Sequence, residues 1–189
     1  LAGTLSIDRI IEQAGRAGYA SLALTDTNNV TGVMEFYVKC RKAGIKPVIG
    51  AELRAGSVRA VALARNWDGY AAICRALTEL VMTYPAARVV TDSGEGAEGA
   101  ADQEHGKGEG DLLLLTDILR RHIDAQVILL SSDEGLLAAL DMQCDAECYV
   151  ELLKHEEGRW PSLLQFARAQ DRPVVAANDP YTLFLVARR

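Results

Sequence analysis

The feature that most constrains the fold is an alternation of short apolar runs with amphipathic helical segments along the chain. Apolar runs at 20–25, 46–50 and 58–64 are too short for helices and predict buried strands. Ile7, Ile10, Ile11 and Ala14 fall at helical spacing, and a second helical pattern covers 31–43. A strand, a loop, a helix and a second strand within about thirty residues favour a parallel pair.

The same alternation continues to the end of the chain. Further helices are predicted at 68–82, 111–122, 134–140 and 161–170, and further strands at 126–130, 148–153 and 174–177. This order predicts an α/β fold with mostly parallel strands, either a barrel or a doubly wound sheet. Six strands are fewer than the eight of a regular β/α barrel, so a barrel would be incomplete.

Composition narrows the class of protein. The chain has 189 residues, 49% of them hydrophobic, and a formal net charge of −6. We do not expect a chain with this net negative charge to bind nucleic acid by itself. A role within a larger DNA-bound assembly stays open. The four cysteines show no zinc-like spacing, and no apolar run approaches the length of a membrane span. We therefore expect a cytoplasmic protein with reduced thiols and no membrane partner.

One segment breaks the pattern. Residues 89–110 hold six glycines, several acids and few apolar side chains. This composition predicts a flexible acidic, glycine-rich loop at about 91–110. A tolerated insertion is one explanation and a regulatory lid is the other. We interpret the rest of residues 1–189 as a single domain.

Polar side chains follow the predicted strands, where parallel α/β folds gather functional groups. Carboxylates and a histidine that converge on one rim can together bind a metal ion. Acidic residues at strand ends also cap helices and anchor loops, which is the alternative explanation. The residues at these ends are Asp26, Thr27, Glu52, Ser131 to Asp133, His155 and Asp179.

Several blocks resemble a known family. The runs 24–32, 43–53, 62–66, 149–155 and 173–179 come in the order found in the PHP domain of the bacterial DNA polymerase III alpha subunit, and together they cover most of the chain. The resemblance implies a PHP-type distorted β/α barrel, similar to a TIM barrel. The opening His-x-His strand of that family is not in this sequence, so the first strand is expected to be missing.

Family members with an intact site hold up to three metal ions, and some hydrolyse phosphoesters. At the matching positions, this chain has Ala2 for Asp, Thr27 for His and Arg59 for His. Asp133 falls near a cysteine position, and Tyr181 stands where the family has His. The resemblance therefore implies a degenerate site.

Three ligand positions of the family survive, namely Glu52, His155 and Asp179. They are too few for a trinuclear centre. We expect no cofactor, or at most one weakly bound zinc or manganese ion on these three side chains. Arg59 would place a fixed positive charge among them and could pair with Glu52 or Asp179, so we predict a salt-bridged polar cluster in place of the metals.

The resemblance implies a non-catalytic, structural N-terminal domain of a replicative polymerase. Its expected partners are the remaining polymerase domains, a proofreading exonuclease subunit, and DNA through the parent polymerase rather than this domain. The alternative is an active metal-dependent phosphoesterase or 3′–5′ exonuclease of the PHP family.

Two other features complete the predictions. Trp67 and Trp160 each precede a helix and are expected to be packing anchors. Lys39, Arg41, Lys42 and Lys46 form a small basic patch, which is either a solvated helix face or a contact for DNA or a partner subunit.

Overall fold

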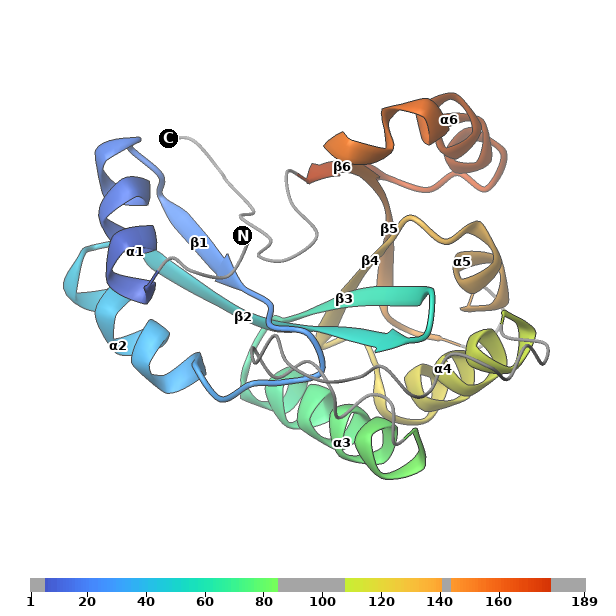
Figure 1. Ribbon diagram of the computed structural model, residues 1–189, viewed down its shortest axis with the longest axis horizontal. Helices are drawn as coiled ribbons and strands as arrows, with labels where there is room; N and C mark the ends of the chain where they lie inside the picture. Colours follow the sequence, from blue (N-terminus) through green and yellow to red (C-terminus); the bar gives the residue numbers. More distant parts are fainter. Residues whose placement is uncertain (1–5, 85–107, 141–143, 178–189) are drawn as a thin grey trace, which may run out of the picture.

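A single six-stranded sheet organises the molecule (Figure 1). The computed structural model describes residues 6–84, 108–140 and 144–177. Within them the strands lie side by side in chain order, so the six predicted strands are confirmed. They are β1 (Ser21–Leu24), β2 (Lys46–Ala55), β3 (Val58–Ala64), β4 (Val127–Ser131), β5 (Glu147–Leu153) and β6 (Val174–Ala177).

The helices lie where the periodicity predicted them, but the alternation is broken twice, since no helix separates β2 from β3 and no strand in the described ranges separates α3 from α4. They are α1 (Ile7–Arg16), α2 (Val33–Lys42), α3 (Trp67–Thr83), α4 (Glu109–His122), α5 (Glu134–Leu140) and α6 (Trp160–Ala169), with a 3₁₀ helix η2 (Lys154–Arg159) before α6. Helix α4 begins at Glu109, inside the loop predicted for 91–110, and residues 91–107 of that loop lie outside the described part.

Strand β3 departs from the parallel pattern. It runs antiparallel to both β2 and β4, whereas the pairs β1–β2, β4–β5 and β5–β6 are parallel. The cause is a tight hairpin, in which Ala55 pairs with Val58 and Gly56 adopts a φ of 55°. Glycine reaches such left-handed backbone angles without steric cost, as two-residue hairpin turns require. This hairpin was not predicted, although the sheet remains mostly parallel.

The reversal of β3 decides what lies at each edge of the sheet. The first residues of β3 lie beside the last residues of β2, since Arg54 pairs with Arg59. Arg59 therefore lies near the edge where the parallel strands end. The last residue of β3, Ala64, lies at the opposite edge.

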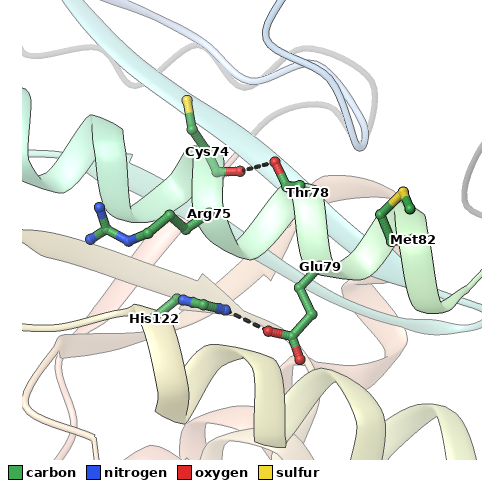
Figure 2. A pocket seen from close by; sticks show the side chains of 6 residues that line it. All are labelled: Cys74, Arg75, Thr78, Glu79, Met82 and His122. Carbon is green, nitrogen blue, oxygen red and sulfur yellow. Dashed lines mark hydrogen bonds and ion pairs between the residues drawn. The ribbon is translucent and has the colours of Figure 1, made fainter.

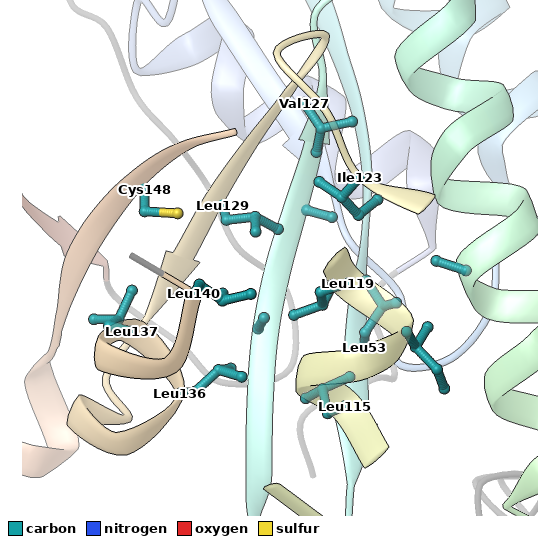
Figure 3. Packing of buried hydrophobic residues seen from close by; sticks show 14 of the residues in the cluster. Leu53, Leu115, Leu119, Ile123, Val127, Leu129, Leu136, Leu137, Leu140 and Cys148 are labelled. Carbon is teal, nitrogen blue, oxygen red and sulfur yellow. The ribbon is translucent and has the colours of Figure 1, made fainter. Parts of the chain in front are cut away.

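The sheet is curled (Figure 1). Apolar side chains form a core layer on each of its faces. In the larger layer, Leu115 and Leu119 of α4 pack in one cluster with Leu53 and Leu129 of the strands (Figure 3). A second cluster joins five strands through Ala23, Val61, Leu63, Leu130, Leu153 and Ala177. Successive side chains of a strand point to opposite faces, which explains why β3 contributes to both layers.

None of the helices in the described ranges is long and apolar enough to cross a membrane. The prediction of one domain over residues 1–189 extends into ranges that the structure does not describe, and it stays a prediction.

Candidate functional site

Glu52 is the centre of the polar rim. It lies inside β2 rather than after it as the sequence suggested, and it is 2% exposed. Its Oε1 accepts hydrogen bonds from Thr27 Oγ1 at 3.1 Å and from Arg54 Nε at 2.9 Å. Its Oε2 accepts a hydrogen bond from Arg59 Nε at 3.0 Å. The carboxylate is therefore fully engaged by donors, which is how a buried charge is tolerated.

Strand register explains why these groups meet. Glu52 and Arg54 are two residues apart on β2, so their side chains share one face. Arg59 lies directly opposite Arg54 on β3. Like charges in that position repel each other, but the Glu52 carboxylate lies between them and accepts from both.

Glu151 adds a second carboxylate to the same arginine. It lies within β5, is 0% exposed, and places Oε2 2.9 Å from Arg59 Nη2. The two groups form an ion pair without hydrogen-bond alignment, and neither Glu151 oxygen has a hydrogen-bond partner in the described part of the chain. Burial raises the pKa of this carboxyl. Arg59 acts in the lowering direction, and Glu52 adds to the rise.

We call Glu52, Arg54, Arg59 and Glu151 the carboxylate–arginine cluster. Arg59 is its bridge, because its side chain is 9% exposed and contacts both carboxylates. Its backbone oxygen accepts a hydrogen bond from Ser131 Oγ at 2.7 Å, which ties the start of β3 to the end of β4. A guanidinium is charged at any physiological pH, so the cluster holds a permanent buried cation.

A pocket of about 380 Å³ opens beside the cluster. Its lining includes Arg54, Arg59, Asp133, His155, Glu156 and Arg159. Two predicted rim residues, Asp133 and His155, are therefore at the pocket. Asp133 caps α5 by accepting a hydrogen bond from Leu136 N at 2.9 Å, and His155 is exposed with its Nε2 3.8 Å from Glu156 Oε1. No hydrogen bond or ion pair within the described residues joins either one to Glu52.

The other predicted rim residues differ in their position. Asp26 supports Glu52 through its backbone, where Glu52 N donates to Asp26 O at 3.0 Å. Burial raises the pKa of the Asp26 carboxyl. Asp179 and Tyr181 lie outside the described residues.

The donor set does not fit a metal centre in the described ranges. No group of three or more His, Cys, Asp or Glu side chains there is arranged to hold an ion. Glu52 is already bonded to two arginines, and a guanidinium contacts both buried carboxylates. A cation at this position would be repelled by Arg59 and would compete for occupied oxygens.

Comparison with known proteins agrees with this architecture. The PHP domain family description matches residues 1–146. This chain belongs to the PHP domain family. Its mixed α/β fold with a curled sheet is that of the distorted, TIM-like PHP barrel.

Relatives of this PHP domain include bacterial DNA polymerases. It is 42% identical over 79 residues to the error-prone DNA polymerase of Symbiobacterium thermophilum, covering 41% of this chain and 7% of that protein. It is 27% identical over 217 aligned positions to the DNA polymerase III subunit alpha of Chlamydia trachomatis, covering 97% of this chain and 17% of that protein. The chain thus spans a small part of the length of these relatives.

A solved structure with a similar fold comes from Bifidobacterium adolescentis and is assigned provisionally to the metal-dependent phosphoesterases. It covers 98% of this chain and 88% of that chain with a TM-score of 0.57, at 14% sequence identity. At that identity, the likeness establishes the shared fold.

The sequence pattern missed two members of the cluster in this PHP domain. Glu151 lies within the family-like run 149–155 but was not predicted as a rim residue, and neither was Arg54. The rule that functional groups follow strands overlooks both, because Glu151 and Arg54 lie within strands. A signal was present, since an acid inside the apolar run 148–153 must find a buried partner.

Proposed function

We propose that this PHP domain is a non-catalytic, structural domain at the N-terminal part of a bacterial DNA polymerase III alpha-type polymerase. The observation that carries the proposal is the position of Arg59, buried between Glu52 and Glu151. The family resemblance puts a metal-ligating histidine at this position, and an arginine supplies the positive charge permanently. The cluster then stabilises the rim instead of binding metal or substrate.

The arrangement of hydrogen bonds and ion pairs supports a role in bracing the rim of the sheet. Arg59 and Glu52 join β2 to β3, Ser131 joins β4 to β3, and Glu151 brings in β5. Removing one partner of such a buried pair leaves an uncompensated charge, which typically costs about 3–5 kcal/mol. A rim held in this way keeps its shape without a bound ion.

The proposed context is DNA replication in the cytoplasm. Polymerisation would reside in domains beyond this chain, consistent with the small share of the relatives' length that it spans. Its partners would be those remaining polymerase domains and a proofreading exonuclease subunit, and DNA would be contacted through the parent polymerase. We propose no cofactor, or at most one weakly bound zinc or manganese ion on Glu52, His155 and Asp179.

The proposal is tested by measuring phosphoesterase and exonuclease activity together with the metal content of the purified chain. The purified chain is incubated with Mn²⁺ and either bis-p-nitrophenyl phosphate or a 5′-labelled single-stranded oligonucleotide, beside an Asp179→Ala variant as control. We expect equal background rates for both proteins, and less than one equivalent of zinc or manganese after dialysis. Turnover that disappears in Asp179→Ala, or stoichiometric tightly bound metal, would refute the proposal.

One observation favours a second candidate, an active metal-dependent phosphoesterase or 3′–5′ exonuclease. The Bifidobacterium protein with the same fold carries a metal-dependent phosphoesterase assignment. This alternative requires a metal site that tolerates Arg59 and Thr27. It predicts a rate that rises with added Mn²⁺ and falls to background with EDTA.

A further inference from the structure

The starting observation is an exposed tryptophan. The prediction that Trp67 is a packing anchor was wrong, because 61% of it is exposed. Trp160 behaves as predicted, since it packs against the main core and its Nε1 donates to Leu153 O at 2.9 Å. The indole N–H of Trp67 has no hydrogen-bond partner in the part of the chain that the structure describes. Most of this large apolar ring is therefore exposed, and its surroundings decide whether it belongs to a larger apolar surface.

Trp67 belongs to a group of three aromatic rings. Its ring lies edge-on to Tyr70, with centroids 5.8 Å apart, and is tilted against Tyr37 at 6.4 Å. We call the hollow beside them the aromatic pocket. It has a volume of about 150 Å³ and is lined also by Pro47, Ile49 and Arg65.

The aromatic pocket is distant from the carboxylate–arginine cluster along the strands. Pro47 is at the start of β2, and Arg65 follows the end of β3. Glu52 and Arg59 lie toward the other ends of these antiparallel strands. The pocket therefore lies at the edge of the sheet opposite the rim, and its lining comes from α2, from the first turn of α3 and from the adjoining ends of β2 and β3.

An exposed arginine lies beside this pocket. Arg41 follows Tyr37 by one helical turn on α2, which places the two side chains on the same face. Lys46 precedes Pro47 on β2, so its side chain points to the other face of the sheet. Arg41 is exposed, and no ion pair within the described ranges involves it. A cation of this kind beside an aromatic hollow favours an acidic residue in the partner.

We propose that the aromatic pocket binds an extended segment of another protein that contains a proline with an acidic residue beside it. Extended proline-containing segments dock on aromatic-lined grooves, because they are stiff and leave their carbonyl oxygens free. The indole N–H of Trp67, which has no partner among the described residues, supplies a donor for such a carbonyl. The volume suits a single ring-sized side chain, and Arg41 pairs with the acidic residue.

The surrounding acids favour a polypeptide over nucleic acid. Asp68 follows Trp67 directly, and Arg65 is already paired with Glu147. A phosphate backbone needs clustered cations over several nucleotides, and it would meet these carboxylates within the same surface. A peptide can place its acidic residue beside Arg41 alone.

The first experiment identifies the ligand. A phage-displayed library of random dodecapeptides is selected on the chain and depleted on a Trp67→Ala variant. We expect enriched peptides that share a proline with Asp or Glu beside it. Enrichment of basic peptides, of peptides without proline, or of peptides that bind Trp67→Ala equally well would overturn the proposal.

The second experiment measures the contribution of each group. The leading peptide, labelled with fluorescein, is titrated by fluorescence polarisation beside a labelled twelve-residue oligothymidine. We expect Trp67→Ala to weaken peptide binding by about tenfold or more, as for interface tryptophans in general. Arg41→Glu should weaken binding of the acidic peptide. It should not weaken binding of a control peptide in which Asp and Glu are replaced by Asn and Gln.

Leu113→Ala is the matched control, because Leu113 on α4 is 60% exposed and lies away from the pocket. It should leave the affinity unchanged. Equal losses in Leu113→Ala and Trp67→Ala would overturn the proposal. Tighter binding of oligothymidine than of the peptide, lost in Trp67→Ala, would replace the peptide surface with a nucleic-acid surface.

Discussion

Two groups of charges in this domain use the same chemistry at different depths. In the carboxylate–arginine cluster, Glu52 lies between Arg54 and Arg59, and its side chain is 3% exposed. On α3 and α4, Glu79 accepts a hydrogen bond from His122 Nε2 at 2.6 Å (Figure 2). Glu79 also pairs with Arg121, but its side chain is 24% exposed. The second group borders an open pocket of about 360 Å³ that also exposes Met82.

The pKa values of Glu79 and Glu151 are shifted in opposite directions. The hydrogen bond from His122, with help from Arg121, lowers the pKa of Glu79. Burial raises the pKa of Glu151 despite an arginine at 2.9 Å. Attraction to a cation dominates where water remains nearby, and loss of hydration dominates where it does not. Ion pairs with similar distances therefore have different consequences for stability.

The largest expected effect comes from removing the bridging cation. Arg59→Met leaves two buried carboxylates facing each other and should lower the free energy of unfolding by about 3–5 kcal/mol at pH 7. Arg54→Met is the matched control, because Arg54 contacts the same carboxylate with a side chain 35% exposed. The control should lose about 1 kcal/mol or less. Urea unfolding followed by circular dichroism measures both.

A double variant separates charge from packing in that experiment. Glu151→Gln in the Arg59→Met background removes the carboxylate that has lost its cation, whereas Glu52 keeps Arg54, and should recover part of the loss. Equal stability of the single and double variants would show that lost packing, not buried charge, explains the effect.

The sequence predicted this cluster only in part, for physical reasons. Periodicity located the strands and helices, because burial of alternating or helical faces is a local property of the chain. The hairpin between β2 and β3 was missed, and with it the reversal that brings Arg59 beside Arg54. Ion pairs such as Arg59–Glu151 join residues far apart in sequence, so their geometry depends on register that no local pattern contains.

The next prediction concerns pH. The pKa of Glu151 is raised in the folded state, so the folded protein keeps this proton where the unfolded chain has lost it. The stabilisation is full below the unfolded pKa and is lost as pH rises through the folded pKa. Glu151→Gln has no proton to lose, so its stability relative to the parent should increase from pH 5 to pH 8 in thermal unfolding.

Glu147→Gln, on the same strand, is expected to show the opposite pH dependence of stability. Tyr149 and then Arg65 lower the pKa of Glu147, so its contribution is present above the unfolded pKa and is lost as pH falls. The stability difference between parent and Glu147→Gln should therefore shrink on acidification. The same pH trend in both variants would contradict the distinction between buried and exposed carboxylates.

The smallest effect is expected at the α3–α4 face. Glu79→Gln should cost about 0.2–1 kcal/mol in low salt, because the pair is partly hydrated, and most of that loss should vanish in about 1 M NaCl, where screening is strong. Arg75→Gln is the control, since Arg75 lines the same pocket and has no ion pair among the described residues. Chemical unfolding in urea at two salt concentrations measures both variants.

The carboxylate–arginine cluster should be far less sensitive to salt, because ions have little access to buried charges. A salt response of Arg59→Met as large as that of Glu79→Gln would mean that water reaches the rim, and the difference in depth would no longer explain the two groups.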